Sequence, residues 1–160
     1  MKTSGNTILI TGGGSGIGRE LALRFNALGN TVIVAGRRME TLEETIAGHQ
    51  NMHAMVVDVE DPRAIVAFAE RVIAEHPRLN VLINNAGIMR REDLTSTHDL
   101  IDAEQTVVTN LLGPIRLTNA LTDHLTSQPD ATIVNVSSGL AFVPLSGTPT
   151  YNATKAAIHS

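Results

Sequence analysis

A run of glycines directly after the first apolar segment constrains the fold of this chain more than any other feature. Residues 7–11 read Thr-Ile-Leu-Ile-Thr, and residues 12–18 read Gly-Gly-Gly-Ser-Gly-Ile-Gly. Glycines permit a tight turn between a strand and a helix, and they let a phosphate approach free backbone N–H groups at the positive end of the helix. A flexible glycine-rich turn is the alternative interpretation. The place of the run between a predicted strand and a predicted helix favours nucleotide binding.

Short β-branched runs alternate with longer stretches of helical period along the chain. The predicted strands are residues 7–11, 31–35, 52–57, 81–84 and 131–136. Two apolar stripes recur at helical spacing between them, namely Ile17, Leu21, Phe25 and Leu28 and then Ile65, Phe68, Ala69, Val72 and Ile73. We expect both stripes to pack on the sheet. The alternation predicts an α/β fold, a doubly wound parallel sheet with helices on both faces.

The composition limits the kinds of partner and chemistry. A chain of 160 residues with 42% hydrophobic and 18% charged residues predicts one globular domain. A formal charge of -4 and 2% aromatic residues give no basic surface or stacking platform, so we expect no nucleic-acid partner. The absence of cysteine excludes thiolate chemistry, and the histidine spacing does not suit a metal. No apolar run is long enough for a membrane span, so we expect a cytoplasmic protein without a membrane partner.

Three further motifs follow the glycine run in a fixed order. They are Asn84-Asn85-Ala86-Gly87, the serine Ser138 and Tyr151-x-x-x-Lys155. With the glycine run they resemble the signature of the short-chain dehydrogenase/reductase family, and the resemblance spans the whole chain. It implies a Rossmann-type dinucleotide-binding domain over residues 1–160 in which the last strands of the family are absent. It also implies a homodimer or homotetramer for the full-length protein, and the apolar stretch at residues 106–127 is one candidate for a subunit interface.

Tyr151 and Lys155 lie four residues apart and therefore share one face of a helix. A nearby ammonium group favours a phenolate, so the pair suits general acid and base catalysis. By itself such a pair is typical of a solvated helix face, and the motifs upstream change that interpretation. By resemblance, Ser138 polarises a substrate carbonyl, Lys155 also holds the nicotinamide ribose, and Asn110 supports a proton-relay water. Ser137 is expected to be a structural hydroxyl.

Cofactor binding is expected to involve a larger group of residues. By resemblance, residues 85–87 form a wall beside the adenine ribose, and residues 58 and 59 form the adenine pocket. For Asn84 the favoured interpretation is a side chain that braces the glycine turn. The expected cofactor-binding residues are Gly12, Ser15, Gly16, Ile17, Gly18, Arg37, Arg38, Asp58, Val59, Asn85, Ala86, Gly87, Tyr151 and Lys155.

The end of the second predicted strand indicates which cofactor is preferred. Gly36 stands where an acidic residue would bind the 2′-hydroxyl of NAD, and Arg37 and Arg38 follow it. A guanidinium can pair with a 2′-phosphate, and the missing carboxylate removes a source of repulsion. We therefore expect NADP(H) to be preferred, with NAD(H) possible. The alternative is two solvated arginines at the start of a helix.

The motifs together predict reversible hydride transfer between NADP(H) and a small-molecule carbonyl or secondary alcohol, with residues 139–150 as part of a substrate wall. The alternative is a non-catalytic dinucleotide-binding module or an inactive truncated family member. Pro114, four residues after Asn110, cannot donate an N–H to the Asn110 carbonyl. Either the helix bends there and leaves that carbonyl free for the relay water, or Gly113 and Pro114 start a separate helix.

Overall fold

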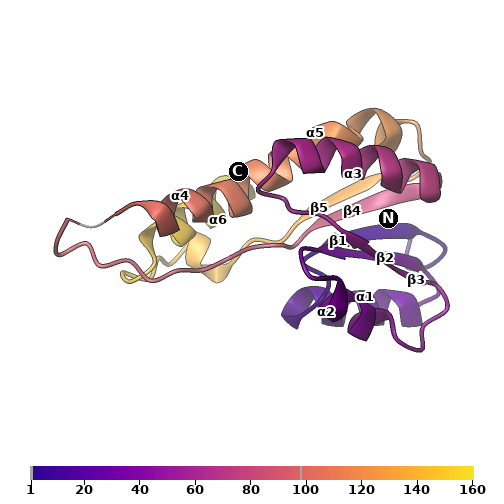
Figure 1. The fold of residues 1–160 in the computed structure, drawn as a ribbon, viewed down its shortest axis with the longest axis horizontal. Helices are drawn as coiled ribbons and strands as arrows, with labels where there is room; N and C mark the ends of the chain where they lie inside the picture. Colours follow the sequence, from indigo (N-terminus) through magenta and orange to yellow (C-terminus); the bar gives the residue numbers. More distant parts are fainter. Residues whose placement is uncertain (1, 98) are drawn as a thin grey trace.

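The computed structural model describes residues 2–97 and 99–160, which form one five-stranded sheet with every strand pair parallel. The strand order is β3-β2-β1-β4-β5 (Figure 1). The strands are β1 Thr7–Thr11, β2 Thr31–Gly36, β3 Met52–Val56, β4 Leu79–Asn84 and β5 Thr132–Asn135. The five predicted strands are confirmed, with bounds that differ by at most two residues at either end. Because β4 pairs with the free side of β1, the chain order reverses between these two strands, where sheets of this kind bind their ligands.

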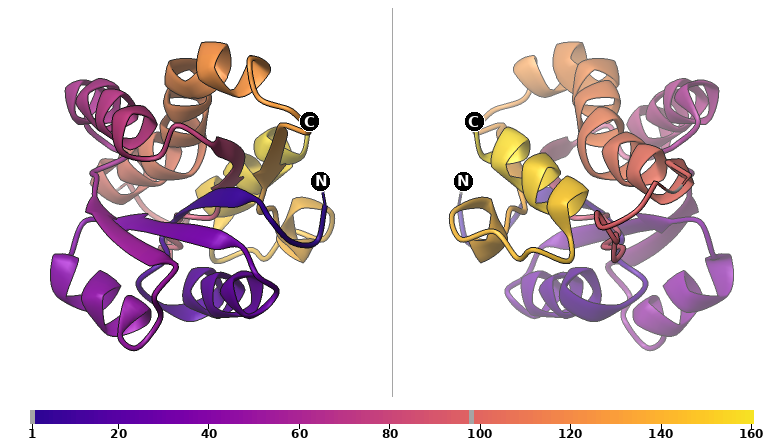
Figure 2. Two further views of the ribbon diagram at one scale, coloured as in Figure 1. Left: turned by 90° about the vertical axis from the view of Figure 1, so that its right-hand side faces the viewer. Right: turned by 90° about the vertical axis from the view of Figure 1, so that its left-hand side faces the viewer.

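Helices cover both faces of the sheet, as predicted. The helices α1 (Gly16–Ala27) and α2 (Met39–Ile46) lie on one face, and α3 (Pro62–Glu75) and α5 (Gly113–Thr126) lie on the other (Figures 1 and 2). Successive residues of β1 point to opposite faces, so Ile8 joins the core under α1 and α2 whereas Leu9 joins the core under α3 and α5. The doubly wound α/β fold is thereby confirmed.

The predicted stripe on α3 is buried against the sheet. Pro62 is the first residue of this helix, and the backbone N of Arg63 donates to the Asp61 carboxylate at 2.8 Å, which caps the helix. The stripe residues that are buried are Ile65, Phe68, Ala69 and Val72, and Ile73 is partly buried against the same core.

The predicted stripe on α1 is wrong at both ends. Ile17 is 66% exposed and Leu28 is 54% exposed, and the buried residues of α1 are Gly18 and Ala22. The reason is the close approach of the helix to the turn after β1, since a Cβ atom at Gly18 would overlap the carbonyl oxygen of Gly12. Small residues therefore form the closest contact, whereas the middle of the stripe, Leu21 and Phe25, is partly buried against the core as predicted.

The stretch around Pro114 is helical throughout but changes its winding. It consists of α4 (Ile101–Val107), the π-helical turn η1 (Val108–Leu112) and α5, which begins directly after that turn. The N–H of Gly113 donates to the carbonyl of Val108, and Pro114 lies in the first turn of α5. The backbone hydrogen bonds around Asn110 therefore do not follow the regular pattern of a straight α-helix. That the Asn110 carbonyl is free for a water stays a prediction.

The last helix, α6 (Pro149–His159), packs against α4, η1 and the short 3₁₀ turn η2 (Gly139–Ala141) (Figure 2). The strand β5 lies at the edge of the sheet, and its residues Ile133 and Val134 are 44% and 36% exposed. Within residues 2–97 and 99–160, no helix is both long enough and apolar enough to cross a membrane.

Candidate active site and nucleotide cleft

The glycine turn after β1 exposes the first N–H groups of α1. Gly12 and Gly16 have φ values of 69° and 53°, which favour glycine, and the N–H of Gly12 donates to the carbonyl of Ala35 at 2.7 Å. Ser15 precedes the helix in an extended conformation, and its side chain makes no capping hydrogen bond. The N-terminus of α1 is therefore left available to an anion.

The side chain that braces this turn is Asn85. Its Nδ2 donates to the carbonyls of Thr11 and Gly12 at 2.9 and 3.4 Å. The hydroxyl of Thr11 in turn accepts from the backbone N of Asn85 and of Ala86, each at 3.1 Å. These contacts join the end of β1 to the segment after β4.

The expectation that Asn84 braces the glycine turn is wrong. Its Nδ2 donates to Asn135 Oδ1 at 2.9 Å and to Thr118 Oγ1 at 3.2 Å, which places the amide between β4, β5 and α5. The physical reason is the alternation of side chains along an extended segment, because consecutive residues point to opposite sides. Asn85 therefore contacts the glycine turn, whereas Asn84 points to the opposite side, towards β5 and α5.

Two adjoining hollows lie at the carboxyl ends of the strands. The first, the Arg37 pocket, contains Arg37, Val59, Gly12, Ala86 and Gly87 from the predicted cofactor residues. The second, the Tyr151 cleft, has a volume of about 360 Å³, within the range of about 300–1,000 Å³ usual for small-molecule sites. The predicted residues that line the Tyr151 cleft are Gly12, Ser15, Ile17, Gly18, Asn85, Ala86, Gly87, Tyr151 and Lys155. Gly12, Ala86 and Gly87 line both hollows and so connect them.

Five predicted residues line neither hollow. Gly16 has open space around its Cα, and Arg38 is the exposed N-cap residue of α2. Asp58 accepts from the backbone N of Glu60 at 3.0 Å, so its carboxylate shapes the loop after β3. Ser138 and Asn110 are the other two.

Lys155 is buried beside Tyr151. Its Nζ lies 5.8 Å from the centre of the Tyr151 ring and donates to the carbonyl of Val136 at 2.7 Å. The residue is only 6% exposed, and burial lowers the pKa of its ammonium group. The predicted shared helix face is thus present on α6, and it points into the Tyr151 cleft.

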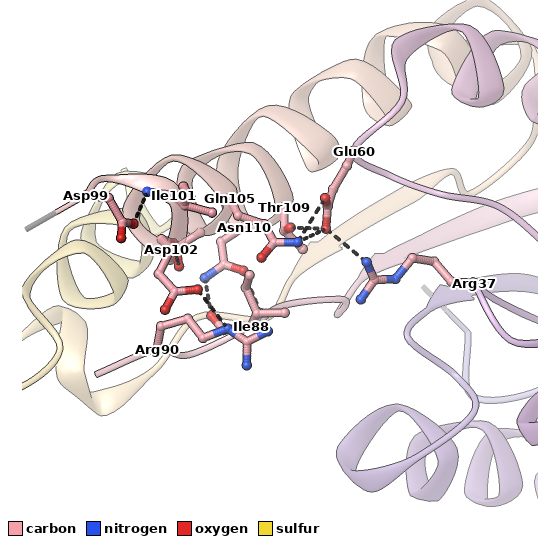
Figure 3. A network of polar contacts seen from close by, with 11 residues as sticks. Arg37, Glu60, Ile88, Arg90, Asp99, Ile101, Asp102, Gln105, Thr109 and Asn110 are labelled. Atoms are coloured by element: carbon pink, nitrogen blue, oxygen red, sulfur yellow. Dashed lines mark hydrogen bonds and ion pairs between the residues drawn. The ribbon is translucent and has the colours of Figure 1, made fainter. Parts of the chain in front are cut away.

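Asn110 clamps the loop after β4. Its Oδ1 accepts from the backbone N of Ile88 and its Nδ2 donates to the carbonyl of Ile88, both at 2.8 Å (Figure 3). The same Nδ2 donates to Thr154 Oγ1 on α6 at 3.2 Å. Because the amide is 1% exposed and engaged on both of its polar atoms, Asn110 positions the loop and α6 relative to each other.

The two serines after β5 occupy different places. Ser137 lines the Tyr151 cleft, and its hydroxyl donates to the carbonyl of Lys155 at 2.9 Å. The Oγ of Ser138 accepts from the backbone N of Leu140 at 3.1 Å, which leaves its own proton available to an acceptor. Residues 139–150 do not line the Tyr151 cleft within the described part of the chain. Several of them form a separate groove with Asn152 and Ala156 on another part of α6.

Glu60 is the charged residue of the Arg37 pocket that sequence reasoning missed. Its carboxylate lies in the Arg37 pocket, where its Oε1 is 3.3 Å from Arg37 Nη1 and accepts from Thr109 Oγ1 at 2.8 Å. The signal was present, since an acidic residue shortly after a buried parallel strand is expected at the ligand edge of the sheet. Ile88 and Thr109 line the same pocket and were also missed.

Comparisons with known proteins identify the family to which the chain belongs. The model of the family described as short chain dehydrogenase matches residues 6–160, and the chain belongs to that family. An uncharacterized oxidoreductase of Bacillus subtilis (strain 168), DltE, is 46% identical over 161 residues, which cover the whole of this chain and 64% of the relative.

Solved structures show the same likeness. A short-chain dehydrogenase from Streptomyces avermitilis superposes with a TM-score of 0.89 at 34% identity, over 97% of this chain and 57% of that one. The L-sorbose reductase of Gluconobacter frateurii, solved with NADPH and L-sorbose, has a TM-score of 0.89 at 28% identity, over 97% and 60% of the two chains. The chain spans less than two thirds of the length of the first curated relatives it matches.

Proposed function

We propose that the protein transfers a hydride between NADP(H) and the carbonyl group or secondary alcohol of a small molecule. The observation that carries this proposal is that Tyr151 and Lys155 line one cleft with the glycine turn at the N-terminus of α1. A proton donor and a phosphate-binding turn in one cleft suit a reaction in which a nucleotide cofactor and a proton meet at one substrate atom.

The residues present fit a dinucleotide. A pyrophosphate at the N-terminus of α1 would meet free N–H groups and the positive end of the helix dipole. The approach depends on glycine, because a Cβ at Gly12 would lie 3.0 Å from the Cα of Ala86 and would fill part of the cradle. Farther along the cleft, a Cβ at Gly87 would lie 3.7 Å from Lys155 Nζ, so this glycine keeps the space beside the lysine open.

The adenosine half would occupy the Arg37 pocket, with Val59 and Ala86 among its walls. Arg37 lies in the pocket, and the exposed Arg38 follows it, so a 2′-phosphate would have two cations within reach. This supports a preference for NADP(H), with NAD(H) as a second cofactor. The solved L-sorbose reductase, which was bound to NADPH, supports the same choice.

The chain's own residues supply the proton chemistry. When bound, NADP(H) supplies or accepts the hydride. In reduction the Tyr151 hydroxyl donates its proton to the carbonyl oxygen, and in oxidation the phenolate accepts the proton of the alcohol. Lys155 stabilises the negative charge on the phenolic oxygen and, as the resemblance implies, also holds the nicotinamide ribose.

Ser138 and Asn110 complete the proposed set. Ser138 donates a hydrogen bond to the substrate carbonyl, a role that its hydroxyl proton permits because Oγ uses a lone pair to accept from Leu140. The side chain of Asn110 is occupied by Ile88 and Thr154, so the group left for a relay water is its backbone carbonyl in the π turn.

The test uses the protein expressed from its natural reading frame. Titration calorimetry with NADPH and NADH is expected to show saturable binding of both, with NADPH bound more tightly. A panel of aldehydes and ketones is then offered with NADPH, and the loss of the absorbance of reduced nicotinamide is followed. Tight binding of NADH with no gain for NADPH would overturn the cofactor preference, and failure to bind either would overturn the function.

A further inference from the structure

Glu60 forms a polar bridge across the Arg37 pocket. Its carboxylate is 3.3 Å from Arg37 Nη1, accepts from Thr109 Oγ1 at 2.8 Å, and lies 3.3 Å from Gln105 Nε2 (Figure 3). The bridge therefore links the end of β2 with α4 and η1. Its side chain is 23% exposed, so the carboxylate is part of the pocket wall and still open to an incoming group.

The two partners of the ion pair are held to different degrees. The backbone N of Glu60 donates to Asp58 Oδ1 at 3.0 Å, and its carbonyl lies 3.5 Å from Arg116 Nη1. The side chain has two further partners on the helix. Arg37 is 54% exposed, and among the described residues its guanidinium has an ion pair through a single nitrogen, Nη1. Glu60 is thus the fixed partner, and Arg37 is the one that can be withdrawn.

This arrangement changes the charge balance that the sequence implied. Gly36 removes the carboxylate from the end of β2, but Glu60 brings one into the same pocket from the loop after β3. A 2′-phosphate bound at Arg37 would compete with that carboxylate for one guanidinium and would be repelled by its charge. An adenosine without the 2′-phosphate would meet neither effect.

We propose that Glu60 is a specificity-determining residue, which competes with the 2′-phosphate of NADP(H) for Arg37 and so limits the preference for NADP(H) over NAD(H). The inference rests on the proposed function, because it requires a dinucleotide in this pocket. It adds that both cofactors are accepted because the cation that selects NADP(H) is partly neutralised by the protein itself.

The substitution Glu60→Gln separates charge from shape. A glutamine amide oxygen can still accept from Thr109 and Arg37, so the pocket keeps its form while the negative charge is lost. The interaction of two unit charges about 4 Å apart at a solvated site corresponds to about a fivefold change in an equilibrium constant. We therefore expect an effect of about threefold to tenfold.

The experiment measures two nucleotide fragments that differ only in the 2′-phosphate. Adenosine 2′,5′-bisphosphate and adenosine 5′-monophosphate are titrated calorimetrically into the protein and its variants, and the ratio of their affinities is compared. The ratio is expected to rise about threefold to tenfold in Glu60→Gln. Glu104→Gln is the matched control, since it removes the same charge from an exposed residue of α4 that lines neither hollow, and its ratio should stay at the wild-type value.

A second variant and a double variant complete the test. Glu60→Thr also removes the carboxylate and must move the ratio in the same direction, which covers the case that the glutamine variant does not fold. In an Arg37→Gln background the effect of Glu60→Gln should be smaller than in the presence of Arg37, because the competition for the guanidinium is gone and only the direct repulsion between the carboxylate and the phosphate remains. The inference would be overturned if the ratio of the affinities for the bisphosphate and the monophosphate were unchanged or lower in both Glu60 variants. It would also be overturned if Glu60→Gln raised this ratio equally with and without Arg37. Failure of the wild type to bind either fragment would instead overturn the proposed function.

Discussion

Glu92, in the loop after β4, caps the first turn of α6 through Thr150. Its carboxylate accepts from the backbone N of Thr150 at 3.0 Å and from the Thr150 hydroxyl at 2.7 Å. The side chain of the N-cap residue of α6, Thr148, makes no capping hydrogen bond, and its hydroxyl donates to Asn152 Oδ1. A carboxylate at a helix N-terminus also interacts favourably with the helix dipole. The segment next to Tyr151 is therefore held in place from outside its own helix.

Replacing Glu92 with alanine is expected to lower the free energy of unfolding by about 0.5–2 kcal/mol, the usual cost of a lost cap. Glu92→Gln keeps an acceptor oxygen and should cost less. Urea denaturation measures both, and Glu44→Ala, at an exposed position of α2, is the control that should change stability by less than about 0.5 kcal/mol. Equal effects of the Glu92 and Glu44 substitutions would show that the cap does not stabilise α6.

The buried ammonium of Lys155 predicts a dependence of stability on pH. Burial lowers its pKa from the usual 10.5, so the unfolded chain holds this proton more tightly than the folded one. Below the lowered pKa, Lys155 is charged in both the folded and the unfolded chain, and the full free-energy cost of burying the charge reduces stability. As pH rises from there towards 10.5, the folded chain loses this proton first, so the cost disappears and stability increases. Relative to Lys155→Met, the wild type should therefore gain stability across that window. Denaturation curves measured at a series of pH values test this, and a stability difference that is independent of pH would contradict it.

Ser137 and Ser138 should respond differently to the same substitution. Ser138→Ala is expected to lower kcat by on the order of 100-fold with little change in cofactor affinity, the scale found when one donor to a developing oxyanion is removed. Ser137→Ala loses the hydrogen bond to the Lys155 carbonyl and should cost about 1 kcal/mol of stability. Kinetics and denaturation of both variants measure this. The reverse pattern would move the catalytic role to Ser137, which lines the Tyr151 cleft.

Two glycines of the turn offer a matched pair of alanine substitutions. At Gly18 a Cβ would overlap the Gly12 carbonyl oxygen, so Gly18→Ala should cost about 1–3 kcal/mol and abolish nucleotide binding. At Gly16 the space is open and only the positive φ of 53° opposes a side chain, so the cost should be about 1 kcal/mol and binding should persist in weakened form. Denaturation and titration with NADPH distinguish the two. Wild-type binding by Gly18→Ala would refute the phosphate-binding role of the turn.

The parts of the fold that local pattern determines could be predicted from the sequence. The β-branched runs predicted the strands, and the apolar stripe on α3 predicted the helix face that packs on the sheet. Both predictions succeeded because residues that are buried against a sheet must be apolar at the spacing of their own element. The stripe on α1 failed where Gly18 lets the helix approach the turn more closely than a larger side chain could. The candidate site residues were predicted from ordered motifs, and the structure brings two of them, Tyr151 and Lys155, into one cleft with the glycine turn.

Contacts between residues far apart in the chain could not be predicted. Glu60 meets Arg37 across 23 positions, and Glu92 meets Thr150 across 58. Neither carboxylate belongs to a motif, so its partner is determined only when the strands and loops are assembled. For the same reason the prediction made from Gly36, Arg37 and Arg38 did not include the carboxylate that Glu60 places in the Arg37 pocket.

The most direct test compares the protein with its Tyr151→Phe variant, both expressed from the natural reading frame. The phenylalanine keeps the ring and removes only the exchangeable proton, so affinity for NADPH should stay within about twofold of the wild type. Carbonyl-dependent oxidation of NADPH, followed with a substrate found in the aldehyde and ketone panel, should fall by at least about 100-fold. Equal rates of NADPH oxidation in the two proteins would contradict the assignment of Tyr151 as the acid and base of the reaction.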